Sequence, residues 1–147
     1  NVNVDEFEEA IAELTELDAT REVSVRKEQA FLRNQLFGSA KEADCTLCGK
    51  RYPVSFLVTA HVKKRSLCTD QEKRDYKNIV VPMCVFGCDS LFEKGYISVS
   101  DGKVVPHAVR QGTSAIRKYV KRFEPVVSAH FPEGTRKYFD WHRDFFA

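Results

Sequence analysis

The sequence predicts an α+β fold, with a central region of short strands between helical segments at the two ends of the chain. Apolar residues recur at helical spacing near both ends, whereas the middle holds short apolar runs bounded by polar loops. Two close pairs of cysteines also fall in this central region. At 147 residues, with 43% apolar and 30% charged content, the chain has the size and composition of one globular domain. We therefore expect a single domain over residues 1–147, divided into a helical extension (1–40), a core (45–105) and C-terminal helices (113–147).

The N-terminal extension is predicted to be a helical hairpin. Its first helix follows Asp5 and carries apolar residues at helical spacing: Phe7, Ile11, Leu14 and Leu17. Ser24 is a suitable N-cap for a second helix, and Gly38 is a suitable residue to end it. The apolar residues expected on that second helix are Val25, Phe31, Leu32 and Leu36.

The central region is predicted to run strand, long loop, strand, helix. Apolar stretches over residues 54–60 and 79–83 favour two strands, and a polar loop joins them. A short helix is expected over residues 89–94, ended by Gly95.

A β-hairpin and two helices are predicted to complete the chain. Strands over residues 96–99 and 103–105 flank Asp101-Gly102, a pair favoured in two-residue turns. Helices are expected over residues 114–123 and 134–146. The last helix has an aromatic stripe that we interpret as core, with a base-stacking surface as the alternative: Tyr138, Phe139, Trp141, Phe145 and Phe146.

The cysteine spacing favours a structural zinc site. Cys45 and Cys48 are three residues apart, and Cys84 and Cys88 form a second close pair. Four thiolates in two such pairs can close one tetrahedral Zn²⁺ site, whereas five cysteines fit poorly with a secreted disulfide framework. Disulfides within the pairs remain the alternative. Cys68 is interpreted as a spare core or surface thiol, with a zinc-ligand role as its alternative.

Charge is distributed unevenly along the chain. The first 20 residues contain seven acidic side chains and no Lys or Arg, so the remainder holds 23 basic against 14 acidic residues, or +9. A basic body attracts polyanions such as nucleic acid, while the acidic first helix can equally be a solvated face. No apolar run is long enough to span a membrane and no signal peptide begins the sequence, so we expect a cytoplasmic protein. Because the chain begins with Asn1, we expect a fragment, a processed form or the nuclease end of a longer polypeptide, and any further segment could carry a specificity or sensor domain.

Several motifs of the central region belong together. They are Cys45-Thr46-Leu47-Cys48, then Ala60-His61-Val62-Lys63, Arg74-Asp75, Asn78, and the run Cys88-Asp89-Ser90-Leu91-Phe92-Glu93-Lys94-Gly95-Tyr96-Ile97-Ser98. With these motifs, the chain resembles the HNH endonucleases over roughly residues 45–105. The resemblance implies a zinc-bound ββα-metal (His-Me finger) core that hydrolyses phosphodiester bonds with a divalent cation.

The same resemblance implies a role for each motif residue. His61 corresponds to the general base, Asn78 to the residue that orients it, and Asp89 to the ligand of a catalytic Mg²⁺ or Mn²⁺. Glu93, one helical turn after Asp89, is a candidate second ligand, with a surface carboxylate as its alternative. The sequence departs from the family pattern in three places. Ala60 stands where the family often has an acidic residue, Asp89 stands where it often has His, and Asn78 is about two residues farther from Asp89.

The loop between the two predicted strands is basic. Its cations are expected to contact phosphates, although a solvated loop would have the same composition: Lys63, Lys64, Arg65, Lys73, Arg74 and Lys77.

These observations lead us to expect a Mg²⁺-dependent endonuclease for double-stranded DNA, in a restriction or phage-defence setting. Cleavage of both strands would favour a two-fold homodimer. The alternative is a catalytically inactive, zinc-stabilised module that binds nucleic acid or another protein.

Overall fold

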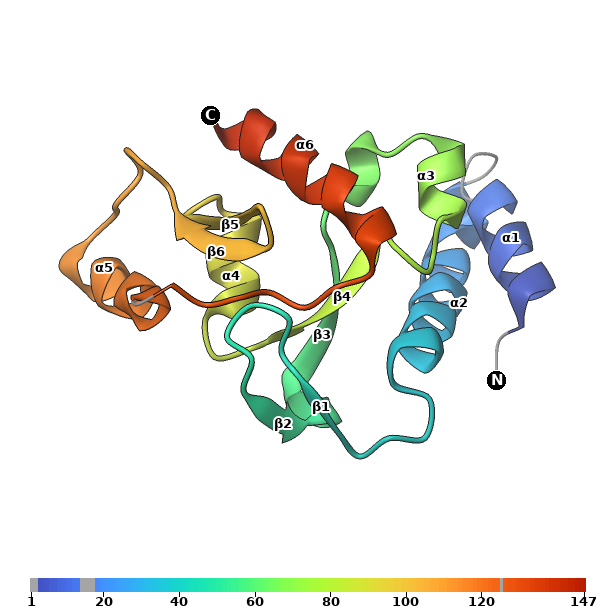
Figure 1. Ribbon diagram of the computed structural model, residues 1–147. Coiled ribbons are helices and arrows are strands. Elements are labelled where there is room, and N and C mark those ends of the chain that lie inside the picture. Colours follow the sequence, from blue (N-terminus) through green and yellow to red (C-terminus); the bar gives the residue numbers. More distant parts are fainter. Residues whose placement is uncertain (1–2, 14–17, 125) are drawn as a thin grey trace.

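The protein has an α+β architecture with helices at both ends (Figure 1). The structure is a computed structural model that describes residues 3–13, 18–124 and 126–147. Within these residues, six strands pair into three two-stranded antiparallel sheets, β1–β2, β3–β4 and β5–β6. In the view of Figure 1, α1 and α2 lie at the right, α5 lies at the left, and the β3–β4 pair and α4 lie between them.

The N-terminal helical hairpin is confirmed, with α1 over Val4–Glu13 and α2 over Asp18–Phe37. Phe7 stacks on Phe31 with ring centroids 4.3 Å apart, and the edge of Tyr76 meets both rings. The hairpin is thereby joined to the core through aromatic contacts. Gly38, at φ 54°, follows the last residue of α2, as expected of a helix terminator.

The expected start of the second helix is wrong. Ser24 lies buried inside α2, six residues after the helix begins, and does not cap it. Residues 18–24 contain neither Gly nor Pro, so nothing in them interrupts a helix that begins earlier. Val25 is correspondingly an exposed residue of α2 and does not join the core. Leu14 and Leu17 lie outside the described residues.

The predicted order of strand, loop, strand, helix is confirmed. β3 (Leu57–His61) pairs antiparallel with β4 (Val80–Cys84), in a register that sets Leu57 opposite Cys84 and His61 opposite Val80. β3 begins later than expected because a 3₁₀ turn, η1 (Val54–Phe56), follows Pro53. The helix α4 (Cys88–Glu93) begins directly after Gly87, whose φ of 136° is accessible to glycine alone at low cost.

Short polar elements surround this unit. β1 (Glu42–Asp44) and β2 (Arg51–Pro53) form a small hairpin around the first cysteine pair. The loop after β3 contains η2 (Arg65–Leu67) and α3 (Asp70–Arg74). A capping box between Thr69 and Glu72 starts α3. Elements of three to five residues have too little periodicity to be found from sequence, and the sequence pattern does not predict them.

The second hairpin is formed as predicted, by β5 (Ile97–Ser100) and β6 (Lys103–Pro106). Asp101 and Gly102 both have positive φ, 52° and 73°, which matches the mirror-image turns of tight hairpins.

The C-terminal part begins with α5 (Ser114–Val120), which continues into η3 (Lys121–Phe123). It ends with η4 (Glu133–Thr135) and α6 (Arg136–Phe146), which packs across β5. The core interpretation of the aromatic stripe is confirmed for Tyr138 and Phe139, which are buried. Phe145 is exposed. The ring of Phe146 lies so close to Gly95 that any side chain at position 95 would clash with it.

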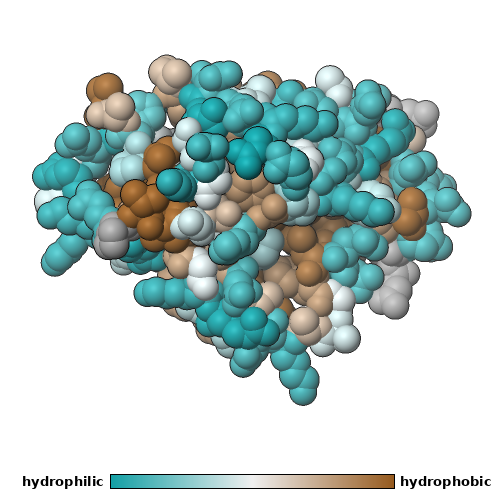
Figure 2. Space-filling view, viewed as in Figure 1, coloured by the Kyte–Doolittle hydropathy of each residue, from teal (hydrophilic) through white to brown (hydrophobic). Residues whose placement is uncertain are grey.

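The surface in this view is mainly hydrophilic, with apolar patches beside β6 and at the centre (Figure 2). Among the described helices, none has the combination of length and apolar content needed to cross a membrane.

Candidate functional site

A pocket of about 480 Å³ lies along β3 and extends to α4 and the loop after β3. Two helices, the strand and that loop contribute the side chains with functional potential: His61, Lys64, Arg65, Asp89, Glu93 and His142. The lining therefore includes the predicted base, both predicted carboxylates and two of the predicted cations, with His61 and the two carboxylates on opposite sides of β3.

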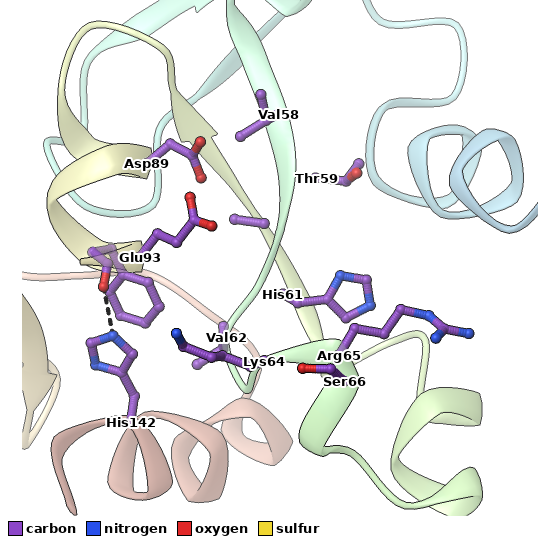
Figure 3. A pocket seen from close by; sticks show the side chains of 12 residues that line it. Val58, Thr59, His61, Val62, Lys64, Arg65, Ser66, Asp89, Glu93 and His142 are labelled. Carbon is purple, nitrogen blue, oxygen red and sulfur yellow. Dashed lines mark hydrogen bonds between the residues drawn. The ribbon is translucent and has the colours of Figure 1, made fainter. Parts of the chain in front are cut away.

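Asp89 and Glu93 enter this pocket from α4, on the side of β3 that carries Val58 (Figure 3). Their spacing of four residues puts them on one helical face. Burial raises the pKa of Asp89, and the neighbouring charge of Glu93 raises it further. Two carboxylates that line one pocket are suited to share a hard divalent cation, with water and phosphate as the other ligands.

His61 lies on the opposite side of β3, beside Arg65 (Figure 3). Alternate residues of a strand point to opposite faces, so His61 faces α2 together with Thr59, whose hydroxyl donates to Gln29 Oε1 at 3.0 Å. The Nε2 atom of His61 is buried and has no hydrogen-bond partner among the described residues. Burial lowers the pKa of His61 to about 4, the charge of Glu28 opposes that shift, and the charge of Arg65 adds to it. The ring is therefore neutral at pH 7, the state required of a base.

An ion pair that the sequence analysis does not predict lies next to His61. Glu28 of α2 is only 1% exposed, and both its oxygens accept hydrogen bonds from Arg65, from Nε and Nη2 at 2.7 Å each. A bidentate pair of this kind fixes the plane of the guanidinium group. The signal that could have found it is the spacing of Glu28 with Phe31 and Leu32, which places a carboxylate on the buried face of the helix.

The side chain of Asn78 is bound to Asp75, and none of the hydrogen bonds of the described residues joins it to His61, so its predicted role of orienting the base stays a prediction. Its Nδ2 donates to Asp75 Oδ1 at 2.8 Å, and Tyr138 of α6 donates to the other oxygen of Asp75 at 2.6 Å. Thr135 donates to the backbone carbonyl of Asn78 at 2.8 Å. Asn78 therefore attaches the start of β4 to the C-terminal helix, and its altered spacing in the sequence agrees with this structural role.

The cations of the basic loop are largely held by acidic neighbours. Lys63 contacts both oxygens of Glu72 at 2.9 and 3.0 Å, and Arg65 is bound to Glu28. Lys73 lies 3.9 Å from Asp70, and the ammonium of Lys64 sits over the aromatic rings at the end of α6. Arg74 and Lys77 are the exposed members of the set. Half of the predicted phosphate-binding cations thus also hold the loop in shape.

The four predicted zinc ligands meet. The sulfur atoms of Cys45, Cys48, Cys84 and Cys88 all lie within 4.8 Å of one another, and all are free thiols. Zinc–sulfur bonds of about 2.3 Å give sulfur–sulfur separations of roughly 3.8 Å in a tetrahedron, so sulfur atoms within 4.8 Å of one another need to move inward by at most about an ångström to bind one Zn²⁺. Hydrogen bonds from the other three thiols hold the pKa of Cys84 far below its usual range. Within the described residues, this is the one group of three or more side chains arranged to hold a metal.

No family model matches the chain, and a search of curated proteins also finds no match. The chemistry of the pocket and of the cysteine cluster is therefore the basis for assigning a function.

His107, His142 and the spare cysteine have structural contacts. His142 donates from Nε2 to the Phe92 carbonyl at 2.7 Å and stacks on the Phe92 ring at 3.6 Å, forming a wall of the pocket. His107 donates from Nε2 to the Phe146 carbonyl at 2.6 Å. Cys68 is buried and its thiol donates to the Lys64 carbonyl at 3.4 Å, apart from the four-cysteine cluster. Burial raises the pKa of Cys68 to about 11, so it is an inert thiol.

Proposed function

We propose that this protein is a metal-dependent HNH-type endonuclease that hydrolyses phosphodiester bonds of double-stranded DNA. The observation that supports it is the unit β3–β4–α4, in which His61, Asp89 and Glu93 line one pocket beside four clustered cysteines. The cysteine cluster would hold a structural zinc that fixes the start of α4, and hence the position of Asp89.

Hydrolysis of a phosphodiester requires a base for the attacking water and positive charge for the phosphate. His61 is neutral and supplies the base, while Lys64, which lines the same pocket, supplies positive charge for the phosphate. Asp89 and Glu93 would hold Mg²⁺ or Mn²⁺, which neutralises charge on the phosphate and the leaving oxygen.

The environment of His61 fits a residue that acts once substrate has bound. Its buried Nε2 has no partner in the described structure, so an arriving phosphate or water would satisfy an unpaired polar atom. A phosphate near the ring also favours the protonated imidazole, which raises its pKa from about 4 toward neutrality. Substrate would thereby strengthen the base that attacks it.

The proposed setting is restriction or phage defence, with a homodimer cutting both strands of DNA. The proposal is tested by replacing His61 and a histidine outside the pocket in parallel. His61→Ala is expected to lower the rate of plasmid nicking by about 10²–10⁴-fold, the usual contribution of a general base, with DNA affinity unchanged. His130→Ala is the control, since His130 is exposed and does not line this pocket. Equal nicking by both variants would refute the catalytic role of His61.

A second function is favoured by the same details that depart from the family pattern. The strand position before His61 is Ala60 rather than an acid, and Asn78 is bound to Asp75, with no hydrogen bond to His61 among the described residues. Both features suit an inactive, zinc-stabilised module that binds nucleic acid or another protein. Such a module would shift a DNA duplex on a gel and leave it uncut at any Mg²⁺ concentration.

A further inference from the structure

We infer that α5, η3 and the loop between Cys84 and Cys88 form a second nucleic-acid-binding surface, in which four cations contact phosphates and two exposed rings contact bases. This surface lies outside the pocket of His61 and Asp89. The inference rests on the proposed function for its choice of duplex DNA as the ligand.

The charge of this segment is unusual for the chain. Residues 113–123 contain four basic residues, Arg117, Lys118, Lys121 and Arg122, and no acidic residue. Three of them are exposed and Arg122 is half-buried. No ion pair involving these four occurs among the described residues, in contrast to Lys63, Arg65 and Lys73 of the loop after β3. Cations without a carboxylate partner are free to exchange their counterions for phosphates.

A shallow depression on α5 has the shape to receive such a ligand. It has a volume of about 590 Å³ and is lined by Ser114 and Ala115 together with three of the cations, Arg117, Lys118 and Lys121. The small side chains of Ser114 and Ala115 leave room for a phosphate group beside the three cations. A neighbouring hollow contains Glu124 in addition to Arg117 and Lys121, so the acid borders the surface without pairing with it.

The segment is attached to the part of the core that positions Asp89. A side chain at Gly87 would lie 3.5 Å from the ring of Tyr119 and 3.7 Å from the guanidinium of Arg122, so α5 and η3 pack directly on this loop. The guanidinium of Arg122 also sits over the Tyr119 ring, 5.2 Å from its centroid. In Figure 1, α4 lies between α5 on one side and the β3–β4 pair on the other. A polyanion that crosses the pocket at α4 can therefore extend onto α5.

Exposed aromatic rings lie on this loop and on the helix packed against it. Phe86 of the loop is 46% exposed, and Tyr119 of α5, which contacts Gly87, is 50% exposed. Phe56 stacks against Phe86 at 5.3 Å, and Tyr52 lies 5.2 Å from Phe86. Exposed rings beside cations that lack a carboxylate partner match the two parts of a duplex, because apolar side chains can insert between base steps while cations contact the phosphates. An acidic protein would be matched by the cations alone and would leave the rings without a role.

The test measures binding of the full chain to a duplex of about 20 base pairs over a range of salt concentrations, without added Mg²⁺. The triple variant Arg117→Gln, Lys118→Gln, Lys121→Gln is expected to bind at least tenfold more weakly. The slope of log affinity against log salt should fall by about 2–3, because each phosphate that a cation neutralises contributes roughly 0.9 to it. A matched triple variant, Lys27→Gln, Lys41→Gln, Lys137→Gln, removes the same charge from other exposed positions and should keep the wild-type slope.

The rings are tested separately. Phe86→Ala is expected to weaken binding about tenfold with an unchanged salt slope, because it removes an inserted ring and no charge. Phe86→Tyr keeps an aromatic ring and should keep the wild-type affinity, which separates loss of the ring from local misfolding. Zinc content and circular dichroism are measured on every variant.

The outcomes distinguish this inference from the proposed function. If the α5 triple variant keeps wild-type affinity and slope, or if the wild type does not bind duplex, the surface is refuted. If Phe86→Ala binds as the wild type does, the rings have another partner and their assignment is wrong. A protein that binds through α5 but never cuts would refute the nuclease proposal and leave this surface intact.

Discussion

The cysteine cluster and the pocket at β3 differ in how much of their chemistry the chain supplies by itself. The cluster has four like ligands within 4.8 Å of one another and needs only a metal ion to be complete. The pocket has two carboxylates on one side of β3, a histidine on the other, and an imidazole nitrogen with no partner in the described structure. This difference is expected if the cluster is a structural metal site and the pocket is, as we propose, completed by substrate.

The largest effect is expected from breaking the cluster. Cys84→Ser removes one of four thiolates, so the zinc-binding free energy of about 10–16 kcal/mol that structural sites add to folding is largely lost. We expect the β3–β4–α4 unit to unfold and elemental analysis to fall from one zinc per chain to none. Cys68→Ser, outside the cluster, is the control and should keep its zinc. A folded Cys84→Ser protein with wild-type stability would show that the cluster is not a structural metal site.

The next effect concerns the ion pair beside the pocket. Glu28→Ala leaves the guanidinium of Arg65 partly buried and unpaired, which is expected to cost about 3–5 kcal/mol of unfolding free energy. The exposed pair between Glu22 and Arg26 offers a matched control, because Glu22→Ala should change stability by roughly 0–1 kcal/mol. Urea denaturation of both variants measures the two costs. Similar costs would mean that Glu28 is not the anchor of the loop after β3.

Acid should destabilise the pocket through its histidines. Burial lowers the pKa of both His61 and His142 to about 4, below the value of 6.5 for an unfolded chain. The unfolded state therefore binds more protons between these values, and stability that is fully present above pH 6.5 is lost as pH falls toward 4. Each histidine is expected to cost about 2 kcal/mol at pH 5 relative to pH 7.

Urea denaturation at the two pH values measures this effect, with zinc content checked at both. His61→Gln should reduce the difference by about half, because it removes one of the two titrating rings. An unchanged pH dependence in that variant would place the titration elsewhere.

The smallest effect is expected at Asn78. Its side chain donates to Asp75, so Asn78→Ala should cost about 1 kcal/mol of stability and leave the rate of DNA cleavage within a few-fold of wild type. Nicking assays and denaturation measure both. A rate loss of a hundredfold or more would return Asn78 to the active site.

Much of the fold could be predicted from sequence because its signals are local. Helical spacing around Phe7 and Phe31, the Asp101-Gly102 turn and the pairing of the cysteines each depend on a few neighbouring residues. Interactions that depend on tertiary packing could not be predicted. The Glu28–Arg65 pair joins residues 37 positions apart, and the hydrogen bond between Thr135 and Asn78 depends on where α6 crosses the core. The start of α2 is predicted too late in the sequence, because a serine suited to capping can equally be buried inside a helix.

The central claim is that zinc at the cysteine cluster and a second, catalytic cation at Asp89 have separate roles. The most direct measurement is nicking of supercoiled plasmid by zinc-containing protein, wild type and Asp89→Asn, as Mg²⁺ is raised to millimolar levels. We expect the wild type to cut only with added Mg²⁺, and Asp89→Asn to stay inactive while retaining one zinc per chain. Undiminished Mg²⁺-dependent cutting by Asp89→Asn, or no cutting by a zinc-loaded wild type that binds the plasmid, would contradict this account.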